Sequence, residues 1–126
     1  MNIENLWQDD GSGLHRRYIG NLSMYDVLEA TIELQEHRLF DSLHYIIEDY
    51  TNATNAPFES KSVKDFSSVV HLRSRARSTL KVAIVSRNSP ESTATAHTFC
   101  EYMKQSHYKC QVFHSLSEAQ AWAAGS

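Results

Sequence analysis

The chain has 126 residues, of which 41% are hydrophobic and 21% charged, so it suits one folded domain and a disordered chain is excluded. Its formal net charge of -3 argues against general nucleic-acid binding, which needs a basic face. The longest apolar run, residues 82–85, is far too short to cross a bilayer. The N-terminal stretch lacks the pattern of a secretory signal, so we expect a single cytoplasmic domain over residues 1–126.

The N-terminal third predicts a hairpin and then a helix. Residues 2–8 and 14–20 resemble strands, and the intervening sequence DDGSG has turn chemistry. Ser23 and Asp26 have the spacing of a helix cap. Apolar residues then recur at helical spacing, which predicts an amphipathic helix of about four turns that carries Met24, Val27, Leu28, Ile32 and Leu39.

The middle of the chain predicts a buried strand, a loop and a second helix. The strand begins at Tyr45, and we expect it to end at Glu48 and Asp49, where the chain leaves the core. A polar loop, residues 51–59, follows. Ser62 is the expected cap of the second helix.

The last part predicts two strands and two helices. Residues 80–86 form a nearly continuous apolar run, typical of a strand near the centre of a sheet and covered on both faces. Ser89-Pro90-Glu91 has the form of a helix start, a strand follows at residues 108–114, and a final helix carries Trp122. The order β-β-α-β-α-β-α-β-α predicts an α/β fold: a single mixed sheet of four to five strands with flanking helices.

This pattern resembles the SpoIIAA-like proteins, bacterial relatives of the STAS domain of anti-sigma-factor antagonists. The resemblance rests on the element order, the strand YIIEDYTN that ends in an acid, and the closing sequence VFHSLSEAQAWA with Ser117 and Trp122. It covers the chain from about Leu6 onward. It implies two alternatives: a STAS-type module that binds a protein partner, or, through fold similarity to CRAL-TRIO domains, a carrier of a lipophilic molecule.

The STAS alternative implies a regulatory serine before the second helix. Ser60 and Ser62 are the nearest positional equivalents, where a phosphate would meet the N–H groups of a helix start. The chain departs from the family here, because a longer loop replaces the compact Asp-Ser-Ser turn.

A rim of polar residues is expected beyond the carboxyl ends of the strands, where α/β sheets collect ligands. Its members are Glu48, Asp49, Arg87 and Ser89. The simpler alternative is structural: Asp49 accepts N–H bonds and Arg87 pairs with an acid.

The second helix presents an apolar stripe, whose simplest interpretation is packing on the sheet. The functional hypothesis is a cover over a small lipophilic ligand, with the preceding loop as a lid. The residues expected to bind it are Phe58, Val63, Phe66, Val70, Phe99 and Met103.

A basic stretch follows that helix, and its members are Arg73, Arg75, Arg77 and Lys81. They either favour the negative end of the helix or attract anionic lipid headgroups. At roughly 1 kcal/mol per basic residue, such membrane contact would be weak, reversible and peripheral, at the inner face of the membrane.

No motif predicts catalysis, a cofactor or a metal. The seven histidines form no i,i+4 pair or Cys/His cluster, and the Gly-rich and nucleophile motifs are missing. Cys100 and Cys110 are expected to be thiols that lie close in space, as small half-buried hydrophobes. The sequence therefore favours a non-enzymatic binding protein, either the lipophilic carrier or the STAS-type module.

Overall fold

A computed structural model describes residues 2–74 and 80–125 of the chain. Its strands and helices alternate as the sequence predicts, and two short 3₁₀ turns, η1 and η2, follow α1 and α3. The elements are β1 (Ile3–Trp7), β2 (Gly13–Gly20), α1 (Met24–Gln35), η1 (Phe40–Ser42), β3 (Tyr45–Ala53), α2 (Ser60–Ser74), β4 (Leu80–Val85), α3 (Pro90–Tyr102), η2 (Met103–Gln105), β5 (Tyr108–Phe113) and α4 (Leu116–Ala124).

The strands form a single mixed sheet in the order β1-β2-β3-β4-β5. β1 pairs antiparallel with β2, and the other neighbours are parallel. The predicted fold class is confirmed. The hairpin lies at one edge as expected, whereas the middle strand is β3, with β4 between β3 and β5.

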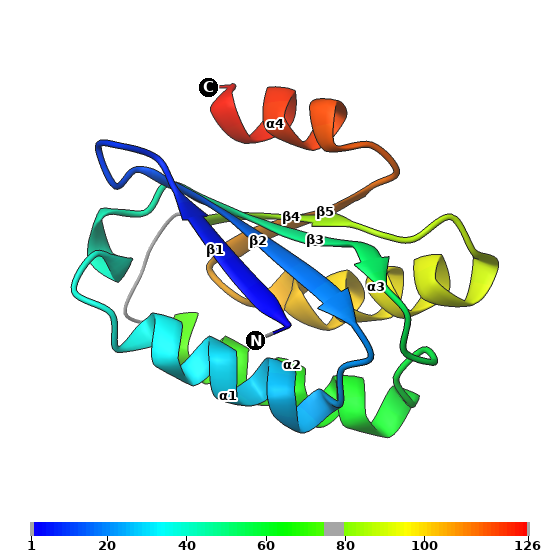
Figure 1. Cartoon of the computed structure of the whole chain (residues 1–126). Helices are drawn as coiled ribbons and strands as arrows, with labels where there is room; N and C mark the ends of the chain where they lie inside the picture. Colours follow the sequence, from blue (N-terminus) through cyan, green and yellow to red (C-terminus); the bar gives the residue numbers. More distant parts are fainter. Residues whose placement is uncertain (1, 75–79, 126) are drawn as a thin grey trace.

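Three helices cover one face of the sheet and the fourth covers the other (Figure 1). Each parallel crossover moves one strand further in the same direction, so α1, α2 and α3 lie on the same side. The core on that side is the larger one and contains Leu14, Ile46 and Ile84. On the other side, the small side chains of Ala119 and Ala123 let α4 pack closely on Ile47 and Val85.

Local capping signals identify two of the helix starts. The Ser23 hydroxyl accepts from the Asp26 N–H and the Asp26 carboxylate accepts from the Ser23 N–H, which is the predicted capping box. Ser89 caps α3, with Pro90 in the first turn, also as predicted. The prediction of Ser62 as a cap is wrong, because α2 begins at Ser60.

The predicted end of the third strand is also wrong. β3 does not stop at Glu48 and Asp49 but continues to Ala53. The reason is its neighbour: β2 extends to Gly20, which pairs with Ala53 after a bulge between Arg17 and Ile19. The polar residues from Thr51 onward therefore still belong to the sheet, and only residues 54–59 connect β3 to α2.

Candidate functional site

A cavity of about 90 Å³ lies beneath α2 and α3, at the carboxyl ends of β3 and β4. Its floor includes Glu48 and Ile84, and the connection between β3 and α2 contributes Pro57 and Phe58. Ligands in open α/β sheets collect at this end of the strands. The structure thus places a hollow where the sequence predicts a ligand site.

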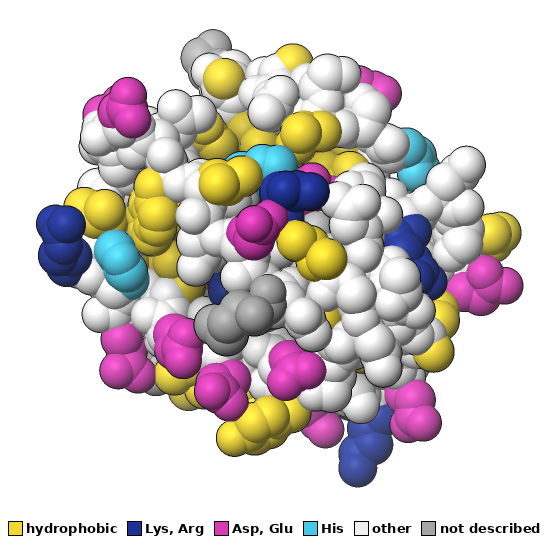
Figure 2. Space-filling view, viewed as in Figure 1, with side chains coloured by type: hydrophobic (Ala, Val, Ile, Leu, Met, Phe, Trp, Pro, Cys, Tyr) yellow, Lys and Arg dark blue, Asp and Glu magenta, His cyan; other side chains and the backbone are white. Residues whose placement is uncertain are grey.

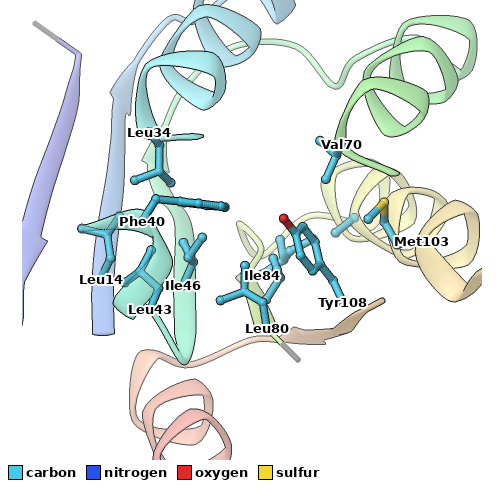
Figure 3. Packing of buried hydrophobic residues seen from close by; sticks show 12 residues of the cluster. Leu14, Leu34, Phe40, Leu43, Ile46, Val70, Leu80, Ile84, Met103 and Tyr108 are labelled. Carbon is cyan, nitrogen blue, oxygen red and sulfur yellow. The ribbon is translucent and has the colours of Figure 1, made fainter. Parts of the chain in front are cut away.

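Four of the six predicted ligand-binding residues line this cavity: Phe58, Val63, Phe66 and Phe99. The rings of Phe66 and Phe99 lie 5.6 Å apart between centroids and so join α2 to α3. The structure does not bring the other two residues, Val70 and Met103, to the cavity. Both are buried in the main core (Figure 3): Val70 lies in the second half of α2, and Met103 begins η2, after the end of α3.

A buried polar cluster adjoins the cavity through Glu48. The Tyr18 hydroxyl donates to Glu48 Oε2 at 2.7 Å. Arg16 Nε lies 3.8 Å from Glu48 Oε1, and only 2% of the Arg16 side chain is exposed. Among the described residues, neither Arg16 Nε nor Glu48 Oε1 has a hydrogen-bond partner. The cluster therefore contains a buried ion pair whose charged groups are close but not hydrogen-bonded, and it lies beside an apolar cavity.

The tyrosines of this cluster remain protonated. Burial raises the pKa of Tyr18 well above its ordinary value of 10.0, so the phenol stays a donor to Glu48. Tyr50 stacks on Tyr18 with ring centroids 4.2 Å apart. Burial and the nearby Glu48 carboxylate also raise the pKa of Tyr50. Burial opposes the charge of Arg16, but the nearby Glu48 carboxylate favours it, and the pKa of Arg16 is raised overall.

Arg16 and Tyr18 were missed by the sequence reasoning, although a signal for them exists. Residues of a strand alternate between its faces, so Arg16 must share the face of Leu14 and Tyr18. An arginine at a core-facing position of an interior strand needs a buried counter-charge, which Glu48 supplies from β3.

Arg87 closes the rim of the cavity. Its Nη1 donates to the Ala53 carbonyl at 2.7 Å, and its Nε and Nη2 donate to the Ser92 hydroxyl. It therefore ties the end of β3 to the first turn of α3, and within residues 2–74 and 80–125 it forms no ion pair with an acid. Ser89 caps α3 as described above. Of the predicted rim, Glu48 and Arg87 line the cavity.

Asp49 faces the opposite side of the sheet. Its Oδ1 accepts from the N–H and hydroxyl of Thr51, and its Oδ2 lies 2.8 Å from His15 Nε2. Burial alone would raise the pKa of this carboxyl, but the hydrogen bonds from Thr51 and His15 outweigh it, so the pKa lies below 3.8. Asp49 therefore stabilises the fold by joining β2 to β3.

Replacing Asp49 with asparagine should lower the free energy of unfolding at neutral pH by about 1–3 kcal/mol, because buried hydrogen bonds are lost. The pKa is lower in the folded state, so the stabilisation is complete above 3.8 and is lost as the pH falls through the folded value. Urea unfolding from pH 2 to pH 7 should show a smaller acid-side loss in the variant than in the wild type. The exposed Asp9→Asn is the control, and equal acid-side losses in Asp49→Asn and the wild type would contradict this assignment.

The two cysteines are free thiols, Cys100 on α3 and Cys110 on β5. The two thiols interact, and a hydrogen bond with Cys100 together with burial raises the pKa of Cys110. A thiol held protonated in this way is a poor nucleophile.

The basic stretch is only partly described. Arg75 and Arg77 lie outside the described residues, as does the side chain of Arg73. The Lys81 ammonium donates to the carbonyls of Trp122 and Gly125, at the end of α4. Lys81 thus satisfies the last carbonyls of that helix.

The two serines of the STAS alternative lie in the first turn of α2, where Ser60 is exposed and Ser62 is partly buried. Within residues 2–74 and 80–125, no cluster of His, Cys, Asp and Glu has the arrangement of a metal site. Across the same residues, every helix is too short or too polar to span a bilayer.

Comparison with protein-family models, curated proteins and solved structures gives no match to this chain. The resemblance to the SpoIIAA-like proteins therefore remains a prediction, and the argument for function rests on the cavity.

Proposed function

We propose that this protein is a non-enzymatic carrier or sensor of a small lipophilic molecule, which binds in the cavity between the sheet, α2 and α3. The observation that carries the proposal is the lining: aromatic and aliphatic side chains from α1, α2, α3, the connection after β3 and the sheet surround a hollow at the carboxyl ends of parallel strands. Phe66 and Phe99 are its central members.

The size of the cavity indicates a closed form. A volume of about 90 Å³ is below the roughly 150 Å³ that holds benzene in an engineered apolar cavity. It is also below the roughly 300 Å³ at which pockets for drug-sized ligands begin. A larger ligand would need residues 54–59 to move outward, since Pro57 and Phe58 line the cavity from this connection.

Membrane contact is a secondary part of the proposal. The cavity meets the first half of α2, whereas Arg73 lies in the last turn of that helix. Acidic side chains gather over α1 (Figure 2), where Asp26, Glu29, Glu33 and Glu36 are exposed. An anionic bilayer would repel this surface. Sedimentation with anionic and neutral liposomes at low salt tests whether the basic stretch binds nevertheless.

The alternative function is STAS-type binding of a regulatory protein. Its support is the exposed hydroxyl of Ser60 at the start of α2, where a phosphate would lie near unpaired N–H groups. Phosphate on Ser60 or Ser62 in protein isolated from its native cells, together with a partner in a pull-down, would favour this alternative over the carrier.

Native mass spectrometry followed by solvent extraction tests the carrier, and it should find an apolar molecule bound to the wild type. Ala96 lines the cavity and is 7% exposed, so Ala96→Leu should fill the hollow and abolish binding. It should leave the protein folded at a cost of about 1–3 kcal/mol. Ala94→Leu makes the same change on the exposed side of α3 and should bind as the wild type does.

The apolar probe isobutyl chloride gives a direct readout by NMR. It should shift the methyl signals of Val63, Ile84 and Ala96 in the wild type, and it should leave those of Val63 and Ile84 unshifted in Ala96→Leu. Absence of these shifts, with no molecule extracted from the protein, would overturn the proposed function.

A further inference from the structure

We infer that the ligand of this cavity carries a neutral hydrogen-bond donor, such as a hydroxyl, that binds the carboxylate of Glu48. This inference rests on the proposed function, because it concerns the same cavity. It names the chemical class of the ligand: a small alcohol-like molecule with an apolar body, rather than a hydrocarbon or a fatty acid.

The first argument is the state of the polar groups in the lining. Most of them have protein partners: Arg87 bonds to Ala53 and Ser92, and the Ser86 hydroxyl lies 3.3 Å from that of Thr93. Among the described residues that line the cavity, two buried side-chain atoms have no hydrogen-bond partner. They are Glu48 Oε1 and Asn55 Oδ1, and both are acceptors.

Buried acceptors without a partner are rare and destabilising, because the desolvation of the oxygen is not compensated. A ligand that supplies a donor would satisfy the acceptor and remove this cost. A purely apolar ligand would leave the acceptor unsatisfied. Of the two acceptors, Glu48 is the better partner for a donor of the ligand. Its second oxygen is already fixed by the Tyr18 hydroxyl, so the carboxylate is held in one orientation.

The charges around Glu48 favour a neutral donor. Arg16 Nε lies 3.8 Å from Oε1 and already balances the negative charge. An anionic head group would be repelled by Glu48 itself, and a cationic one would add a second buried positive charge beside Arg16. A neutral hydroxyl avoids both the repulsion from Glu48 and the second buried charge beside Arg16.

The rest of the lining determines the body of the ligand. Val63, Phe66, Ile84, Ala96 and Phe99 offer only apolar contacts. Because the hollow is small, the best first probe is a short branched alcohol. Isobutanol and isobutyl chloride are matched in shape, and only the alcohol has a donor.

The test is an NMR titration of the wild-type protein with each probe, followed through the methyl signals of Val63, Ile84 and Ala96. Isobutanol should bind about tenfold more tightly than isobutyl chloride, as expected for a hydrogen bond to a charged group. Glu48→Gln should reduce this preference several-fold. Glu101→Gln, the same change at an exposed acid of α3, should keep it.

Tyr18→Phe provides a second readout if Glu48→Gln does not fold. It removes the donor to Oε2 and leaves both oxygens of Glu48 open, so isobutanol should bind more tightly and isobutyl chloride unchanged. Equal binding of the two probes to the wild type would overturn the inference and leave the proposed function standing. Failure of both probes to shift the lining methyls, with no molecule extracted from the protein, would overturn both.

Discussion

Replacing Glu48 with alanine should lower the free energy of unfolding by about 3–5 kcal/mol, because it leaves the charge of Arg16 buried without its partner. Arg16 is 2% exposed, and an arginine side chain stays protonated in proteins, so it cannot escape the penalty by losing its proton. The Tyr18 hydroxyl also loses its acceptor. Urea denaturation at neutral pH measures the loss.

The double variant Arg16→Met, Glu48→Leu is the matched control. It removes both charges and keeps comparable volume, so it should recover most of the stability lost in Glu48→Ala; the Tyr18 hydroxyl still lacks its acceptor in both variants. A Glu48→Ala loss below about 1 kcal/mol would contradict this account. That result would mean that Arg16 is solvated from the groove between β1 and α1, which it also lines.

The elements that could be predicted are those with local signals. The caps at Ser23 and Ser89 need only the residues within one helical turn, and both are confirmed. The end of β3 could not be predicted in this way. It depends on the pairing of Ala53 with Gly20, a contact between residues far apart in the chain. A polar tail after an apolar run looks like a loop unless the neighbouring strand is known to be long.

The same distinction applies to the cavity. Helical periodicity places Val63, Phe66 and Val70 on one stripe, and all three do face inward. Periodicity does not say which turn of a helix lies over a hollow and which over packed sheet. Val63 and Phe66, in the first half of α2, meet the cavity, whereas Val70 meets the core. Where each helical turn lies along the sheet depends on the tertiary structure. The apolar stripe alone therefore predicts more ligand-binding residues than the cavity has.

Leu14→Ala should lower the free energy of unfolding by about 2–5 kcal/mol. Leu14 is 0% exposed and lies on β2 in the largest core cluster, between the sheet and the three-helix layer. Removing its branched side chain loses the transfer free energy and leaves a void, because neighbours on the rigid sheet relax only partly.

Leu6→Ala is the matched control for this change, since Leu6 lies on the adjacent strand β1 and is 50% exposed. Its effect should stay within about 0.5 kcal/mol. Equilibrium denaturation of both variants, read by circular dichroism and by tryptophan fluorescence, measures the difference. Similar losses in the two would mean that β1 and β2 contribute equally to the core, contrary to the burial of Leu14 beneath the helices. A large loss in Leu14→Ala alone would show that the hairpin is stabilised through the face of β2 that also carries Arg16. The buried ion pair and the apolar core then stabilise the same strand.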